Sequence, residues 1–290
     1  MKRAISLFLA SLLALFLCAC GGGVSQQHEQ TTQPQATAPK SLKVLAIGNS
    51  FSEDATKYLY QVAKAEGVEE VVIGNLFVGG CTLKMHAGYI KSGEAKYRYD
   101  KCVNGEWEKT PETTLLTGLQ DEAWDVITMQ QGSVDSGLVD THQPYLDELV
   151  AYVRQNSNNP NAKLYWHMTW AYQEDSTHKA FPTYGNSQMT MYYGIVNVVQ
   201  KVIEPNENFH GIIPVGTVIQ NLRGSIIGDK LTRDGYHLND FGRVAAAYTW
   251  YAVLADQKLQ DAKYSVFNGD LIVKAVNAAL DKPQAVTAVS

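Results

Sequence analysis

Short apolar runs alternate with amphipathic stretches along the chain from Ser41 onward. Apolar runs of about four to eight residues are typical of buried β-strands, and apolar positions spaced three and four apart are typical of helices. The strands predicted in this way cover residues 42–48, 69–79, 124–131, 162–170 and 211–216. The predicted helices cover residues 53–67, 111–122, 142–157, 186–203, 239–255 and 269–280. This alternation indicates an α/β fold with a mainly parallel sheet that helices cover on both faces.

Local signals refine this pattern at the ends of two predicted helices and at one turn. Ser52 is predicted to cap helix 53–67 and Asn239 to cap helix 239–255. Residues 95–110 break the alternation, because large and polar residues alternate there around Asn104-Gly105. An Asn-Gly pair suits a type I′ turn, so this stretch is predicted to be a β-hairpin insertion that projects from the sheet.

The first forty residues are predicted to lie outside the folded domain, which begins at residue 41. Residues 1–20 combine Lys2 and Arg3 with an apolar run that ends in "LCAC", as in a secretory signal peptide. That ending resembles a bacterial lipobox, which implies that Cys20 is lipidated and becomes the mature N-terminus; a plain secretory signal cut nearby is the alternative. Residues 21–40 are rich in Gly, Gln, Thr and Pro, which predicts a disordered tether. The expected location is therefore extracytoplasmic, with a lipid anchor in a bacterial membrane and the membrane face left open.

Composition excludes some partners and leaves the state of the cysteines open. The chain has 290 residues, of which 45% are hydrophobic and 18% are charged, and its net charge is −5. An acidic chain of this kind is not expected to bind nucleic acid, and its only predicted contact with a lipid bilayer is the anchor. Cys81 and Cys102 could pair in an oxidising compartment or remain buried thiols. The histidines show no metal-ligand spacing, so no metal and no organic cofactor is predicted.

The residues that directly follow the predicted strands carry the candidate chemistry. In an open parallel sheet, ligands bind beyond the carboxyl ends of the strands. Ser50 follows the first strand, and "RDGYHLND" near the C-terminal end holds Asp234 and His237 three residues apart. A serine becomes a nucleophile when a histidine takes its proton and a carboxylate orients that histidine. The predicted oxyanion donors are the backbone N–H groups of Ser50 and Gly80 and the side-chain amide of Gln131.

These blocks resemble the SGNH/GDSL hydrolase superfamily, in particular its poorly characterised DUF4886-like branch. The first block of that branch reads Gly-Asn-Ser-Phe-Ser and its last reads Arg-Asp-Gly-Tyr-His-Leu, as residues 48–52 and 233–238 do here. The resemblance covers about residues 42 to 260 and implies a three-layer α/β/α sandwich, SGNH/flavodoxin-like in its layers. It matches Ser50 to the nucleophile, Asp234 and His237 to the acid and base, and Gly80 to the second-block glycine, with Gly79 as an alternative.

The sequence departs from the superfamily pattern at two positions. Asn49 stands where the first block usually has Asp, a change that leaves the nucleophile in place. The third block is usually Gly-x-Asn-Asp, whereas this chain has "QQGS". The Gln-Gly-Glu block of the related sialate O-acetylesterase-like group suggests that Gln131 replaces the asparagine, with Gln130 or Ser133 as alternatives.

Aromatic residues near the strand ends are candidates for substrate contacts. Trp170 and Tyr172 follow the fourth predicted strand, where they form either a sugar-stacking wall or part of the core. His86 follows the second block and is a further candidate for lining the cleft.

The function predicted from these residues is that of an extracytoplasmic serine esterase that works through an acyl-enzyme. Surface tethering and the superfamily resemblance suggest O-acyl or O-acetyl groups on carbohydrate as its substrate. The main alternative is a surface lipoprotein that keeps the SGNH fold, binds glycans and has lost turnover. The intact set of Ser50, Asp234 and His237 argues against that alternative. A thiol enzyme built on Cys81 is a third hypothesis, which the lone position of Cys81 and its possible pairing with Cys102 argue against. The sequence gives no oligomeric state.

Overall fold

A mixed seven-stranded sheet forms the centre of the computed structural model, which describes residues 38–264 and 267–290. The strands are β1 (Ser41–Gly48), β2 (Glu70–Phe77), β3 (Tyr97–Val103), β4 (Glu106–Thr113), β5 (Val126–Met129), β6 (Lys163–His167) and β7 (Phe209–Ile213), in the spatial order β4-β3-β2-β1-β5-β6-β7. Strands β2, β1, β5, β6 and β7 pair in parallel, whereas β3 pairs antiparallel with both β2 and β4. The predicted signal peptide, Cys20 and most of the predicted tether lie outside the described residues.

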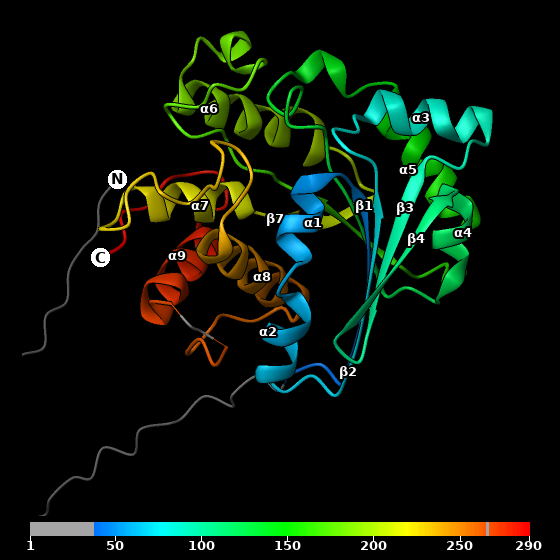
Figure 1. Cartoon of the computed structure of the whole chain (residues 1–290), viewed down its shortest axis with the longest axis horizontal. Coiled ribbons are helices and arrows are strands. Elements are labelled where there is room, and N and C mark those ends of the chain that lie inside the picture. The colour runs from blue at the N-terminus through cyan, green and yellow to red at the C-terminus, as the bar shows by residue number, and fades with distance from the viewer. Residues whose placement is uncertain (1–37, 265–266) are drawn as a thin grey trace, which may run out of the picture. The chain divides into compact units, whose positions relative to one another are not determined.

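Helices cover both faces of this sheet. They are α1 (Ser50–Thr56), α2 (Leu59–Ala65), α3 (Leu83–Ser92), α4 (Leu115–Asp121), α5 (Tyr145–Asn156), α6 (Gln188–Val198), α7 (Val215–Arg223), α8 (Asp240–Leu254) and α9 (Gly269–Asp281), with short turns η1 (Val139–Thr141) and η2 (Phe181–Tyr184) and a π-helical end of α6, η3 (Val199–Ile203). Figure 1 shows α1, α2 and α8 on one side of the sheet and α3, α4 and α5 on the other. The predicted three-layer α/β/α fold is therefore confirmed.

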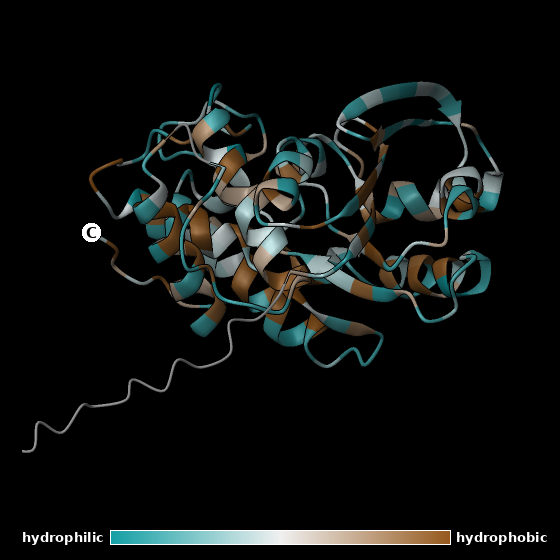
Figure 2. Cartoon of the chain, turned by 90° about the horizontal axis from the view of Figure 1, so that it is seen from below, coloured by the Kyte–Doolittle hydropathy of each residue, from teal (hydrophilic) through white to brown (hydrophobic). Residues whose placement is uncertain are grey.

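The core follows from the apolar runs that predicted the strands. In β1, the central strand, Val44, Leu45, Ala46 and Ile47 are all buried, as expected for a strand with helices on both faces. Hydrophobic, brown segments gather on the strands and on the inner faces of the helices in Figure 2, and the loops are largely teal. Because β1 lies between β2 and β5, its carboxyl end opens onto the loops that follow both neighbours.

The predicted hairpin exists, but it extends the sheet and does not project from it. Strands β3 and β4 turn at Asn104 and Gly105, whose φ angles of 54° and 84° fit the predicted turn. The structure contradicts the prediction of a projecting insertion, because β3 pairs along its length with β2. The β2 edge offers unpaired backbone groups that only another strand can satisfy over such a length, so β3 continues the sheet there.

Helix boundaries differ from the pattern most at the first predicted helix, and α7 begins inside the stretch predicted as strand 211–216. The stretch predicted as one helix over 53–67 is two helices, α1 and α2, and Asn49 rather than Ser52 caps the first of them. Ser52 is buried inside α1, where its Oγ lies 2.7 Å from Asn49 O and 2.9 Å from Asn75 Oδ1. Asn239 caps α8 as predicted, since its side chain accepts a hydrogen bond from Gly242 N.

Candidate active site

Ser50, His237 and Asp234 form a hydrogen-bonded chain at the carboxyl end of β1. Ser50 is the first residue of α1, and the other two residues lie on the loop between α7 and α8. His237 Nδ1 lies 2.6 Å from Asp234 Oδ2, and His237 Nε2 lies 2.8 Å from Ser50 Oγ. Because the carboxylate accepts the proton on Nδ1, Nε2 is left to accept the proton of the serine hydroxyl. The structure thus brings the three predicted residues together in the order that nucleophile activation needs.

The backbone of the loop holds Asp234 in its ionised form. Its Oδ1 accepts hydrogen bonds from the backbone N–H groups of His237, at 2.8 Å, and Tyr236, at 3.2 Å. Burial raises the pKa of Asp234, but these hydrogen bonds and the His237 side chain outweigh burial and hold that pKa below its usual range. The loop therefore presents a carboxylate to His237 at neutral pH.

Asn49 ties the nucleophile to the loop that follows β2. Its side chain is buried, and its Oδ1 accepts hydrogen bonds from Phe51 N and Gln130 Nε2, both at 2.9 Å. Its Nδ2 donates to Cys81 O at 3.0 Å. An aspartate could not make that last hydrogen bond while ionised, since a carboxylate only accepts. The departure from the usual first-block Asp therefore has a structural role.

Two backbone N–H groups near Ser50 are available for an oxyanion. The Ser50 N–H is at the start of α1, where helical N–H groups lack intrahelical partners, and the loop with Gly80 is joined to this turn at Val78 and Cys81. Within the described residues, neither the Ser50 nor the Gly80 N–H has a hydrogen-bond acceptor. Gly80 is exposed and has a φ of 63°, a conformation that favours glycine.

The prediction for Gln131 as an oxyanion donor is wrong. Its side chain is buried, its Nε2 donates to Thr141 O and Oγ1 at 3.2 Å, and its Oε1 accepts from Leu83 N and Gly132 N. The amide nitrogen is therefore buried and donates to Thr141. Gln131 joins the loop after β5 to the start of α3 instead.

The two alternatives for the third block have other roles as well. Gln130 is buried between the nucleophile turn and β6, where its Nε2 donates to Asn49 and its Oε1 lies 2.8 Å from His167 Nδ1. Ser133 is partly exposed, and its Oγ lies 2.9 Å from Tyr172 OH. Of the third block, Ser133 alone is accessible within the described residues.

Trp170 and Tyr172 belong to the core, which is one of the two roles that the sequence left open for them, and they do not form a sugar-stacking wall. Both side chains are fully buried. Trp170 stacks on Phe51 with ring centroids 4.2 Å apart, and its Nε1 donates to Tyr236 O at 2.7 Å. Trp170 thus supports α1 and the His237 loop from inside, which makes it part of the scaffold of the site.

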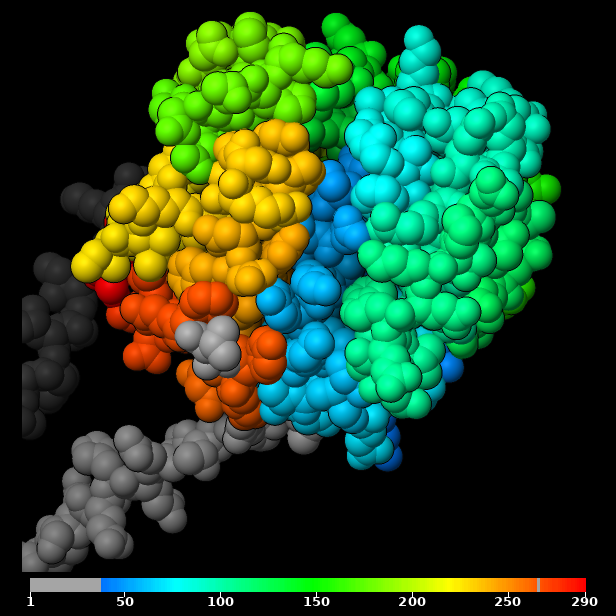
Figure 3. Space-filling model, in the orientation of Figure 1, coloured from blue at the N-terminus to red at the C-terminus, as the bar shows by residue number. Residues whose placement is uncertain are grey.

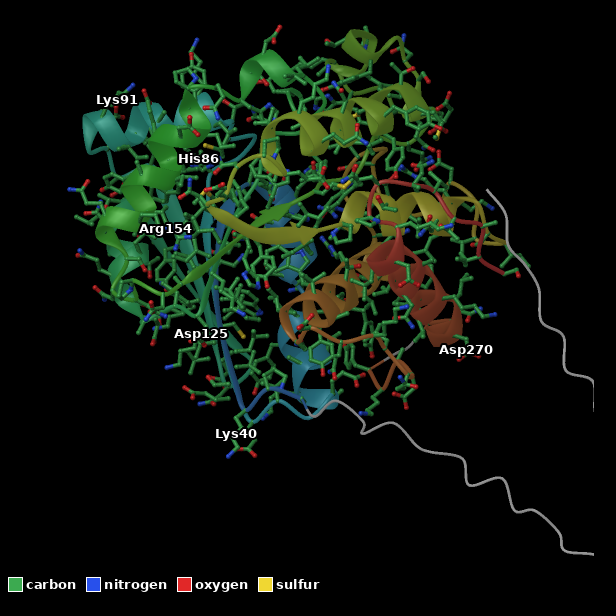
Figure 4. All side chains as sticks on the ribbon, turned by 180° about the vertical axis from the view of Figure 1, so that it is seen from behind. Lys40, His86, Lys91, Asp125, Arg154 and Asp270 are labelled. Carbon is green, nitrogen blue, oxygen red and sulfur yellow. The ribbon has the colours of Figure 1, made fainter. Side chains whose placement is uncertain are left out.

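His86 is also inaccessible, and its predicted role in lining the cleft is wrong. It lies in the layer of α3 and α5, where its Nδ1 lies 2.7 Å from Tyr97 OH (Figure 4). Burial lowers the pKa of His86 to about 4. Cys81 and Cys102 are both free and buried, and burial raises the pKa of Cys81 to about 12. A thiol of that kind is protonated at neutral pH, so it is a poor nucleophile.

Sequence reasoning missed a buried ion cluster next to Ser50, His237 and Asp234, which are called the triad below. Asp54 on α1 is paired with Arg233, the residue before Asp234, and with Arg243 on α8. The signal was present, because Arg233 belongs to the last motif block, but nothing in the sequence spacing joins it to Asp54.

Figure 3 shows the blue surface of the α1 segment in a furrow between the cyan segment after β2 and the yellow-orange segment that precedes α8.

Two features are absent from the described residues. No group of His, Cys, Asp and Glu side chains in residues 38–264 and 267–290 could hold a metal ion. Over the same residues, none of the helices combines the length and the apolar character that crossing a membrane requires.

Comparison with known proteins identifies the family. The family model described as "Domain of unknown function (DUF4886)" matches residues 43–288. The crystal structure of a DUF4886 family protein from Bacteroides uniformis is 40% identical, covers 85% of this chain and 97% of that chain, and superposes with a TM-score of 0.80. No functionally curated protein matches the chain.

More distant structures share the fold. A protein from Slackia heliotrinireducens that is named as a candidate SGNH hydrolase is 18% identical, with 74% of this chain and 99% of that chain covered and a TM-score of 0.51. A catalytic mutant of an acetylxylan esterase from Geobacillus stearothermophilus is 11% identical, with 76% and 97% covered and a TM-score of 0.50. The chain therefore belongs to the DUF4886 family, and its fold is that of the SGNH hydrolases.

Proposed function

We propose that this protein is a serine hydrolase that cleaves carboxylic esters through an acyl-enzyme. The observation that carries this proposal is the unbroken hydrogen-bonded chain from Ser50 Oγ through His237 to Asp234. The backbone N–H groups of Ser50 and of Gly80, on the loop joined to the Ser50 turn, can bind the negative oxygen of a tetrahedral intermediate, as acyl transfer requires.

The reaction would proceed in two steps, acylation of Ser50 and deacylation. Ser50 Oγ attacks the ester carbonyl while its proton passes to His237 Nε2, and Asp234 stabilises the resulting imidazolium. Collapse of the intermediate breaks the bond to the alcohol, which leaves with the proton from His237. Water then attacks the acyl-serine, gives its proton to the same histidine and releases the carboxylic acid and Ser50.

The oxyanion would be held by the N–H groups of Ser50 and Gly80. Loss of one such donor typically lowers kcat by about 10²–10³-fold. With Gln131 committed to Thr141, the nearby group that remains accessible in the third block is the Ser133 hydroxyl.

As the finer part of this proposal, the substrate is an O-acyl or O-acetyl group on carbohydrate. Tyr236 lies beside His237, with ring centroids 4.3 Å apart, and His178 lies 4.7 Å from Tyr236. Both are partly exposed, so they can offer ring faces and hydrogen bonds to a sugar. The name of the acetylxylan esterase with the same fold is consistent with such a substrate. An extracytoplasmic location with a lipid anchor at Cys20 completes the proposal and rests on the sequence alone.

Ester hydrolysis by the purified protein tests the proposal. The substrates are 4-nitrophenyl acetate and an acetylated xylo-oligosaccharide, and Ser50→Ala is compared with Ser92→Ala, which changes an exposed serine on α3. We expect both substrates to release acetate with the native protein and with Ser92→Ala, and Ser50→Ala to be inactive. Tight oligosaccharide binding without acetate release would contradict the esterase and favour the glycan-binding alternative.

A further inference from the structure

A buried carboxylate joins α1, which carries the nucleophile, to both ends of residues 234–237, here called the acid–base segment. Asp54 lies one helical turn after Ser50 on α1, and its side chain is 2% exposed. Its Oδ2 accepts hydrogen bonds from Arg233 Nη1 at 3.0 Å and from Leu238 N at 2.8 Å. Arg233 directly precedes Asp234, and Leu238 directly follows His237. Asp54 is therefore hydrogen-bonded to the residues on either side of the acid–base segment.

Two arginines hold the Asp54 side chain in place. Its Oδ1 accepts from Arg243 Nε at 2.9 Å and from Arg233 Nη1 at 3.1 Å. A buried carboxylate is costly unless charged partners and hydrogen bonds compensate it, and replacement of a buried ion pair by apolar residues is often neutral for stability. Stability alone is therefore a weak explanation for this cluster.

The acid–base segment has a second attachment, to the residues that follow β6, and one of these residues, Trp170, also stacks on Phe51 of α1. Trp170 Nε1 donates to Tyr236 O at 2.7 Å, and Gln173 N donates to Gly235 O at 2.8 Å. These contacts hold the segment to the residues that follow β6. The Asp54 cluster joins the same segment through charged side chains to α1, the helix that carries Ser50.

We propose that Asp54 is a positioning residue for the triad, which sets His237 against Ser50 through Arg233 and Leu238. This inference rests on the proposed function, because it assigns the consequence of the cluster to Ser50 activation. A misplacement of about 1 Å in reacting groups can cost about 10²-fold in rate. Loss of the Asp54 charge should therefore slow Ser50 chemistry with little effect on substrate binding.

The experiment compares Asp54→Asn with Glu66→Gln. Glu66 is a matched control, because its side chain is 7% exposed and paired with Lys263 at 3.1 Å, at the end of α2. The readouts are kcat and KM for 4-nitrophenyl acetate and the rate of Ser50 labelling by a fluorophosphonate. For Asp54→Asn we expect kcat and the labelling rate to fall by about 10²-fold, with KM within about twofold of native, and no change for Glu66→Gln. A folded Asp54→Asn with native kcat and labelling rate would overturn the proposal.

A second variant, Arg233→Gln, tests the same positioning role. If Asp54→Asn does not fold, Arg233→Gln removes the charged contact to the acid–base segment, while Arg243 and the Leu238 N–H still bind Asp54, and its kcat should fall by at least about tenfold. Native kcat in Arg233→Gln would again overturn the proposal.

Proton NMR separates this inference from the proposed function. The His237 Nδ1 proton, in a hydrogen bond of 2.6 Å to Asp234, should give a far-downfield signal that His237→Ala lacks. We expect Asp54→Asn to broaden or lose this signal and Glu66→Gln to keep it, whether or not the protein turns over an ester. A native protein without labelling or turnover would refute the esterase, whereas an unchanged signal in Asp54→Asn would refute the positioning role.

Discussion

The hydrogen bond from Asn49 to the loop after β2 gives a prediction whose size can be worked out. Asn49→Asp restores the residue that the superfamily usually has, yet here it replaces a donor by an acceptor. Asn49 Nδ2 donates to Cys81 O at 3.0 Å, and both residues are buried. The variant therefore loses a hydrogen bond and places a carboxylate against a buried carbonyl oxygen.

The expected loss of stability follows from that contact. An unsatisfied buried polar group costs about 1–3 kcal/mol, and a buried charge beside it costs more, so the free energy of unfolding should fall by about 2–4 kcal/mol. For a domain of this size that lowers Tm by about 5–10 °C. Gly80 lies between Val78 and Cys81 in the released loop, so kcat should fall by about 10²-fold if its N–H binds the oxyanion.

Urea unfolding at several pH values tests this reasoning, with Asn208→Asp as the control. Asn208 is exposed, so the same change of charge there should alter the free energy of unfolding by less than about 0.5 kcal/mol. At a pH low enough to protonate the introduced carboxyl, its hydroxyl can donate to Cys81 O, and the penalty in Asn49→Asp should shrink. Native stability in Asn49→Asp, or a penalty that does not change with pH, would refute the role assigned to this hydrogen bond.

Further predictions concern the oxyanion loop, the support of the site and the dependence of stability on pH. Gly80→Ala should lower the free energy of unfolding by about 1–2 kcal/mol, because the φ of Gly80 is 63°. It should also lower kcat for 4-nitrophenyl acetate by about 10²-fold, and a native kcat would exclude the Gly80 N–H as an oxyanion donor. Trp170→Ala removes the Phe51 stack and the bond to Tyr236 O, so urea unfolding should show a loss of about 3–5 kcal/mol, against less than about 1 kcal/mol if Trp170 were a surface wall. Burial lowers the pKa of His86 to about 4, so the unfolded chain binds a proton at a higher pH than the folded one. Stability should therefore fall as pH drops from about 6.5 toward 4, by up to about 1.4 kcal/mol per pH unit from this group, and His86→Gln should have a shallower slope in the same unfolding assay; an equal slope would contradict the assignment.

The fold and the triad could be predicted from sequence because their signals are local. Apolar runs give the strands, and the residues at the strand ends meet at one edge of a parallel sheet. Ser50 and the Asp234-x-x-His237 spacing are each contained in one short block, and the parallel topology brings the two blocks together.

The incorrect and open predictions concern residues whose partners are distant in sequence. Gln131 is bound by Leu83 and Thr141, and Trp170 is covered by Phe51, so their burial depends on packing that no local pattern contains. The turn at Asn104-Gly105 predicts the hairpin, but the pairing of the hairpin with β2 depends on the unpaired edge of the sheet. Asp54 was overlooked for the same reason, because its partners lie almost at the other end of the chain.

Active-site labelling tests the central claim, that Ser50 is an activated nucleophile, most directly. The purified protein is treated with a fluorophosphonate beside Ser50→Ala, His237→Ala and the Ser92→Ala control, and the adduct is located by mass spectrometry. We predict one adduct, on Ser50, that is present in Ser92→Ala and lost in Ser50→Ala and His237→Ala, because His237 Nε2 lies 2.8 Å from the serine oxygen. A folded protein with no adduct, or with an adduct on another residue, would contradict the account and leave Ser50 as the first residue of a helix.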